Sequence, residues 1–263
     1  MDLTCDDGTL RMSLMEHLED LRARIIKALY GFGAIFVLCL IYSEKLFDIA
    51  MAPGRAALAR TGIPGAEFVA LTVMEKFQII WVQVPVVASL FLGAPWILWQ
   101  LWAFISPGLY KHEKKWAVPF VLSSAGLFIL GGLFGYFIAL GNGMSFLLGI
   151  GKEDHVVPLI SIADYFDVFV DLLLGIGVAF EVPVLMFFLT LIRVVSPGFL
   201  FRHSRYAIMA IVIVAAVVTP TPDAFNLMLF AVPMCMLFFL GIFLSYLLVR
   251  KREGRWPFKR RVS

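Results

Sequence analysis

The chain has 263 residues, of which 61% are hydrophobic and only 16% are charged. A soluble globular domain is closer to half apolar and a quarter charged, so that class is excluded. Apolar runs such as 118–140 carry no charge and are long enough to cross a bilayer as a helix, and the alternation of a membrane β-barrel is absent. The expected fold class is an all-α polytopic membrane protein.

In chain order, the sequence predicts a single membrane domain over 1–263 with six spans. A charged, amphipathic and cytoplasmic segment over 1–23 comes first, and a basic tail over 250–263 comes last. We expect no cleavable signal, because nine charged side chains fall within residues 1–24, where a signal peptide needs an apolar run. The six spans are expected at about 24–44, 76–103, 117–140, 164–192, 205–219 and 226–249, with the fifth and sixth short.

Lysine and arginine residues are distributed unevenly between the two sides that these spans define. Of the 22, 17 fall in the N-terminal segment, the second–third connection, the fourth–fifth connection and the tail, and 5 fall on the opposite side. Because positive residues are retained on the cytoplasmic side, we expect both termini in the cytoplasm. The formal net charge of +3 then reflects topology and attraction to anionic membrane lipid, and we expect no nucleic-acid binding.

The segment before the first span has apolar residues at helical spacing between Leu14 and Ile25. Asp20 and Arg24 are four residues apart and can pair on such a helix, with Glu19 beside them. Two interpretations remain open. The segment is an interfacial helix that leads the chain into the membrane, or its carboxylates also form part of a cytoplasmic binding face.

Glu113 is the acidic residue of a basic connection over 110–115, directly after an aromatic and proline-containing run over 104–109. The positive-inside rule explains the lysines of this connection. It explains neither the carboxylate nor the run before it. The pattern therefore suggests a docking place for a cationic partner.

Glu181 lies about midway along the expected fourth span. A carboxylate at the bilayer centre costs about 3 kcal/mol on insertion scales, so Glu181 must face protein or water, or be protonated. Pro183 predicts a kink directly after it. Three aspartates over 164–171 precede Glu181 on the same expected helix. They suggest either a hydrated helix end or a polar side that runs toward Glu181.

Enzyme templates and metal-ligand patterns are absent from the sequence. It has no His-Glu-x-x-His, Gly-x-Ser-x-Gly or P-loop motif, so we expect no catalytic residue, no metal and no cofactor. The four histidines are far apart in sequence, and the three cysteines lack metal-type spacing. A small-solute secondary transporter is the main alternative, although internal repeats and paired broken helices are not evident. A membrane scaffold is a further alternative.

Several motifs resemble those of one family. The run 17–22, His-Leu-Glu-Asp-Leu-Arg, is similar to the N-terminal signature of the TatC family, the multispanning receptor of the twin-arginine protein translocase. Further similar motifs follow in family order: Ala52-Pro53, Ala94-Pro95, 100–104, Pro107-Gly108-Leu109-Tyr110-Lys111-His112-Glu113, Gly135-Tyr136-Phe137, Phe180-Glu181-Val182-Pro183 and Thr219-Pro220-Thr221-Pro222-Asp223. The resemblance covers residues 13 to about 245.

The resemblance implies a concave, glove-shaped protein of six helices in the bacterial inner membrane, without enzymatic activity. It implies recognition of signal peptides that carry two adjacent arginines on folded cargo. It further implies single-span partners of the TatA and TatB types, assembly of several copies in one complex, and transport driven by the proton-motive force.

The resemblance also implies roles for individual residues. Signal-peptide contacts fall on Asp20 or Glu19, on Glu113 and on Phe104, and a transport or partner contact in the membrane falls on Glu181. Structural roles, including those at the outer cap, fall on Arg22, Pro53, Pro95, Tyr136 and Asp223.

Two positions depart from the family pattern. The acid before Leu-Arg is usually Glu, whereas Asp20 is one methylene shorter, so either Asp20 or Glu19 could reach the signal arginines. After Asp223, many relatives have Ser-Gln where this chain has Ala-Phe-Asn, so a polar contact there is absent or moved to Asn226.

Overall fold

The computed structural model describes residues 14–61, 67–105, 117–149, 159–218 and 224–253. Five helical segments in these ranges are long and apolar enough to cross a membrane: Met15–Ile41, Val73–Ile105, Val118–Gly149, Ile162–Leu191 and Leu227–Arg250. A sixth apolar helix, Ser204–Val217, is shorter. The chain is therefore an all-α polytopic membrane protein, and five rather than six helices meet the length expected for a span.

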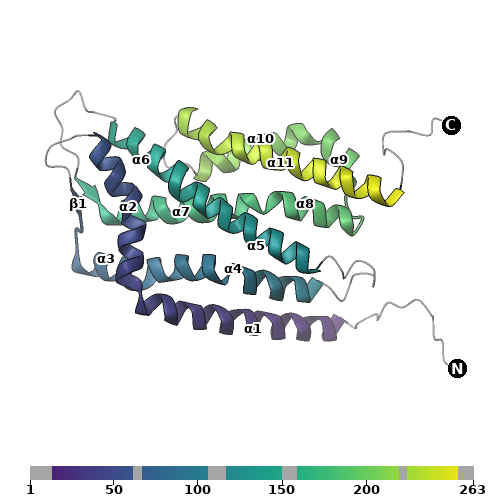
Figure 1. Ribbon diagram of the computed structural model, residues 1–263, viewed down its shortest axis with the longest axis horizontal. Helices are drawn as coiled ribbons and strands as arrows, with labels where there is room; N and C mark the ends of the chain where they lie inside the picture. The colour runs from purple at the N-terminus through teal and green to yellow at the C-terminus, as the bar shows by residue number, and fades with distance from the viewer. Residues whose placement is uncertain (1–13, 62–66, 106–116, 150–158, 219–223, 254–263) are drawn as a thin grey trace.

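The helices follow one another as long rods joined by short elements (Figure 1). The first part contains α1 (Leu14–Ile41), α2 (Ser43–Thr61), β1 (Phe68–Val69), α3 (Val73–Gln78), the π-helical turn η1 (Ile79–Gln83) and α4 (Val84–Ile105). The middle contains α5 (Ala117–Phe134), the π-helical turn η4 (Gly135–Ala139), α6 (Leu140–Gly149), β2 (Ile160–Ser161), α7 (Ile162–Phe180) and α8 (Val182–Leu191). The last part contains α9 (Pro197–Arg202), α10 (Ser204–Val218) and α11 (Ala224–Glu253).

The two ends of this bundle differ. The first turns of α1 and the last turns of α11 lie at the same end, together with the end of α4, and we call this the terminal end (Figure 1). At the opposite end, the far end, α2 turns away from α1 and packs on α6. There β1 also pairs with β2 in parallel, with Phe68 opposite Ile160. The far end is therefore covered by short elements, whereas the terminal end consists mainly of helix ends.

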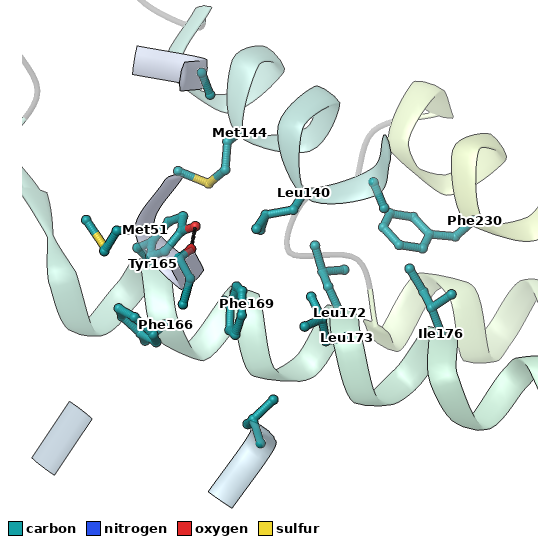
Figure 2. Packing of buried hydrophobic residues seen from close by; sticks show 14 of the residues in the cluster. Met51, Leu140, Met144, Tyr165, Phe166, Phe169, Leu172, Leu173, Ile176 and Phe230 are labelled. Carbon is teal, nitrogen blue, oxygen red and sulfur yellow. Dashed lines mark hydrogen bonds between the residues drawn. The ribbon is translucent and has the colours of Figure 1, made fainter. Parts of the chain in front are cut away.

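The largest buried core lies toward the far end and is built around α7. Tyr165, Phe166, Phe169, Leu172 and Ile176 form one side of α7 and are buried. Figure 2 shows them in a row facing side chains from α2, α6 and α11. Inside a membrane such burial stabilises the fold through van der Waals packing between helices rather than through transfer out of water. The row of buried side chains makes α7 the central helix of this half of the molecule.

Three expectations about individual helices can be compared with the structure. The helix α10 has 15 residues, which confirms a short fifth element. The prediction of a short sixth span is wrong, because α11 has 30 residues and continues through Pro233 to Glu253. Basic residues such as Arg250 favour the end of a helix electrostatically, so the charged tail extends α11 instead of ending it. The break that Pro183 predicts is present, since α7 ends at Phe180 and α8 begins at Val182.

The N-terminal amphipathic segment is continuous with the first apolar helix. α1 begins at Leu14 and runs without a break to Ile41. Its apolar stripe is not packed inward, because 58% of Leu18 and 50% of Ile25 are exposed. Such a surface suits lipid or a partner helix, whereas Asp20 and Arg24 between them are partly buried.

Candidate functional site

The terminal end of α1 is fixed against α4 by one indole ring. Trp96 Nε1 of α4 donates a hydrogen bond to the carbonyl oxygen of Lys27 in α1, at 3.0 Å. A Cβ at Gly31 would lie only 2.1 Å from the same nitrogen, so the glycine makes room for the indole. This contact sets the depth at which the side chains of α1 meet those of α4.

At the terminal end, the two helices bring His17 of α1 and Phe104 of α4 together, with Asp20 one turn further along α1. The rings of His17 and Phe104 stack with centroids 4.5 Å apart and an interplanar angle of 22°. Asp20 lies three residues after His17, hence on the same side of α1 and one turn further along. We call these three residues the terminal site.

The Asp20 carboxylate is only partly satisfied. Its Oδ1 accepts a hydrogen bond from Nε of Arg24 at 3.2 Å, in a pair whose side chains are 22% and 30% exposed respectively. Its Oδ2 is shielded from solvent and accepts no hydrogen bond from the described residues. Among the described residues, one oxygen of the Asp20 carboxylate therefore has no donor.

The other predicted signal-peptide contacts are placed differently. Glu19 is exposed and belongs to the neighbouring side of α1, about 100° from Asp20. Arg22 is exposed as well. Glu113 lies outside the described residues. The structure thus brings Asp20 rather than Glu19 to the side of α1 that carries the His17–Phe104 stack, and the position of Glu113 stays a prediction.

Glu181 is half-buried at the joint between α7 and α8. Ser124 of α5 donates a hydrogen bond from its hydroxyl to Oε2 of Glu181. Oε1 is shielded and has no hydrogen-bond donor among the described residues. Glycines allow this contact, because a Cβ at Gly131 of α5 would lie 2.9 Å from Cα of Gly177 in α7. The close approach of the two helices lets a short serine reach the carboxyl group.

Ser124 was not among the predicted site residues. It is fully buried and lies 57 residues from Glu181 in sequence. A pair of serines within the apolar run 117–134 is the signal that could have indicated a polar contact inside the bundle. Which of the two points inward depends on helix packing. The other one, Ser123, donates to the carbonyl oxygen of Phe120 in its own helix.

Two of the three aspartates of α7 line a groove. Asp167 and Asp171 are exposed and border a cavity of about 300 Å³ together with Gln83 of η1 and four apolar residues. α7 therefore has the predicted polar side between Asp167 and Asp171. Glu181 does not line the groove, so the polar side does not continue as one cavity to the middle of the span.

At the far end, two tyrosine hydroxyls bind consecutive carbonyls of α2. Pro53 lies inside α2 and has no N–H, which leaves the carbonyl of Ile49 without its helical donor. Tyr136 of η4 donates to that carbonyl at 2.7 Å, and Tyr165 of α7 donates to the carbonyl of Ala50 at 2.6 Å. Tyr136 therefore replaces the bond that Pro53 removes.

Glu75 was missed entirely by the sequence interpretation. Its Oε2 accepts from the backbone N–H groups of Leu71 and Thr72 at 2.9 and 3.3 Å, which completes a capping box at the start of α3. Its Oε1 accepts from the Ser161 hydroxyl at 3.0 Å and from the N–H of Ala163 at 2.9 Å. Ser161 is the N-cap of α7, and Glu75 of α3 binds both its hydroxyl and the N–H of Ala163. The Thr-x-x-Glu spacing at 72–75 could have indicated half of this arrangement.

The remaining predicted positions are structural or undescribed. Pro95 lies within α4, which continues through it. Asp223 lies outside the described residues. In the described ranges, no group of three or more His, Cys, Asp or Glu residues is arranged to hold a metal ion.

Comparisons with known proteins agree with one another. A family model described as Sec-independent protein translocase protein (TatC) matches residues 16–233. The Sec-independent protein translocase protein TatC of Koribacter versatilis is 39% identical over 244 residues, which cover 93% of this chain and 89% of that protein. The corresponding protein of Escherichia coli is 35% identical over 243 residues, covering 92% and 91%. A crystal structure of the twin-arginine translocase receptor TatC matches with a TM-score of 0.75 and 31% identity, covering 89% of this chain and all of that one (100%).

Proposed function

Because the chain belongs to the TatC family of Sec-independent protein translocase proteins, we propose that it recognises twin-arginine signal peptides of folded cargo and nucleates the translocation site. The observation that carries this proposal is the terminal site. It places an incompletely satisfied carboxylate, Asp20, one helical turn along α1 from His17, whose ring stacks on that of Phe104.

The chemistry of the terminal site suits a guanidinium ligand. A carboxylate accepts two parallel hydrogen bonds from an arginine, and the flat guanidinium also stacks on aromatic faces. In the proposed complex, Asp20 binds one signal arginine beside Phe104, and Glu113 supplies the second carboxylate. An ammonium group forms neither the fork nor the stack, so two lysines are poor substitutes for two arginines.

The surroundings of this site follow from the same proposal. The terminal end faces the cytoplasm of a bacterial cell with both chain termini, as the distribution of lysine and arginine favours. The protein works in the inner membrane with single-span subunits of the TatA and TatB types and with further copies of itself. Transport is driven by the proton-motive force, and the bundle itself performs no catalysis.

Glu181 has a separate role in this proposal. Its shielded Oε1 has no donor in the part of the chain that the structure describes, and a carboxyl oxygen without a partner inside a membrane span costs free energy. A polar side chain in the span of a partner subunit would supply the missing hydrogen bond when the translocation site assembles. Glu181 thus serves transport after the signal peptide has been recognised.

The test of recognition is a peptide-binding measurement on the purified protein in lipid nanodiscs. A labelled twin-arginine peptide should bind at least tenfold more tightly than its twin-lysine counterpart, because hydrogen bonds to charged groups contribute about 1.5–3 kcal/mol. Asp20→Asn and Phe104→Ala should each lower the affinity for the arginine peptide by about tenfold.

Glu19→Gln is the matched control, since it removes the same charge from the exposed neighbouring position. It should change the affinity less than twofold. Equal binding of the arginine and lysine peptides by the unmodified protein would contradict the proposed function, and a larger loss for Glu19→Gln than for Asp20→Asn would reverse the assignment of the carboxylate.

A further inference from the structure

The Asp20 carboxylate is already bound to an arginine of its own chain. Arg24 lies four residues further along α1, and its Nε donates to Oδ1 of Asp20 at 3.2 Å. Arg24 therefore offers Asp20 the same functional group that a twin-arginine signal peptide would bring.

This internal contact uses only part of what a carboxylate can accept. Arg24 reaches one oxygen through Nε, and Oδ2 has no donor among the described residues. A guanidinium that approaches end-on can fill both oxygens with two parallel hydrogen bonds. An incoming arginine can therefore form more hydrogen bonds to Asp20 than the one that Arg24 forms.

From this geometry we propose that Arg24 is an internal competitor, which occupies Asp20 in the resting protein and is displaced by a signal-peptide arginine. The inference rests on the proposed function and adds a residue that sets the affinity threshold of the site. Weak, single-contact cations do not displace Arg24, whereas a correctly oriented guanidinium does. Displacement releases the side chain of Arg24 toward solvent, since it is already 30% exposed.

The size of the expected effect follows from competition. A ligand that binds only the unpaired state of Asp20 has its apparent affinity reduced by the fraction of time that Asp20 is unpaired. Partly exposed ion pairs of this kind are weak, so removal of Arg24 should tighten peptide binding by about threefold to fivefold. A purely structural role for the pair predicts no tightening, because loss of the pair would leave Asp20 less well oriented.

The experiment measures twin-arginine peptide affinity for Arg24→Gln and Arg24→Met in nanodiscs. The methionine variant keeps a long apolar stem at this partly buried position and provides a second protein if the glutamine variant does not fold. Lys27→Gln is the charge-matched control, because it removes one positive charge from α1 at a position about 10 Å along the helix from Asp20. Both Arg24 variants should bind about threefold to fivefold more tightly, and Lys27→Gln should stay within a factor of about 1.5.

A double substitution separates competition from a general change in charge. In the Asp20→Asn background, Arg24→Gln should produce no tightening, since no carboxylate remains to be released. Unchanged or weaker binding by both Arg24 variants would overturn the competitor role while the loss caused by Asp20→Asn left the proposed function in place. Absence of any peptide binding by the unmodified protein would overturn both.

Discussion

At the scale of single residues, Glu181 has two carboxyl oxygens in different surroundings. Oε2 accepts a hydrogen bond from the Ser124 hydroxyl, and Oε1 is shielded and has no donor within the described ranges. This asymmetry suits a carboxyl group that its own chain holds in place through one oxygen, while a partner subunit supplies the hydrogen bond to the other oxygen. It also gives Ser124 a positioning role that its neighbour Ser123 lacks, because Ser123 binds only its own helix.

Ser124→Ala should therefore impair transport more than peptide recognition. The substitution leaves both oxygens of Glu181 without a donor from the bundle, which costs about 1–3 kcal/mol and lets the carboxyl group turn away. Transport of a folded reporter into inverted vesicles should fall severalfold, while affinity for the signal peptide stays within about twofold. Ser123→Ala is the control and should leave both measurements unchanged. A parallel loss of peptide affinity in Ser124→Ala would count against separate roles for the two sites.

Tyr136 and Pro53 form a second residue-scale unit. Tyr136→Phe removes the donor from the Ile49 carbonyl that Pro53 has left free, so the substitution should lower the free energy of unfolding by about 1 kcal/mol. In a Pro53→Ala background, residue 53 regains an N–H for that carbonyl, and the same substitution should cost clearly less. Thermal unfolding of the four proteins in detergent measures this coupling. Additive effects would show that the tyrosine does not act through the proline.

At the scale of elements, the packing of α1 on α4 decides where the terminal site forms. The indole of Trp96 fits against α1 because residue 31 has no Cβ. The extensive contact between α1 and α4 then places His17 level with Phe104, although 87 residues separate them in sequence. A shift of one turn along α1 would move Asp20 about 5 Å from its present depth.

Gly31→Ala should accordingly displace Trp96 and loosen the terminal site. A Cβ at 2.1 Å from the indole nitrogen cannot be accommodated without movement, and such overpacking costs typically about 1–3 kcal/mol. Gly33→Ala is a strong control, because a Cβ there meets nothing within 4 Å. Thermal unfolding and signal-peptide affinity should both decline for Gly31→Ala and stay near the unmodified values for Gly33→Ala. Equal thermal stability and equal peptide affinity of the two variants would contradict the proposal that Trp96 fixes α1 against α4.

At the scale of the whole molecule, the sequence was sufficient for the fold class and for the break after Glu181. Long uncharged runs can only be membrane helices, and Pro183 cannot continue the helical hydrogen bonds. The extent of α11 was misjudged, because charged residues that leave the hydrocarbon core can still be helical. Hydrogen bonds between distant segments could not be predicted, because hydropathy does not encode which helices are neighbours. Examples are the bond of Ser124 to Glu181 and that of Ser161 to Glu75.

The terminal site was only partly predictable for the same reason. Helical periodicity alone puts Glu19 and Asp20 on different sides of α1, yet it does not say which side meets α4. The stacking of His17 on Phe104 supplies that information and favours Asp20. The far end shows the converse case. The family resemblance implied structural roles for Pro53 and Tyr136, but nothing in the sequence indicated that the Tyr136 hydroxyl binds the Ile49 carbonyl.

The most direct test of the central claim is photocrosslinking from position 104 in native membranes. A photoreactive phenylalanine analogue at that position should crosslink to a twin-arginine peptide, and far less to a twin-lysine peptide. Glu113→Lys should abolish the crosslink while the protein stays inserted in the membrane, because the second carboxylate of the proposed pair is lost. Undiminished crosslinking of the Glu113→Lys protein to the twin-arginine peptide would contradict the account.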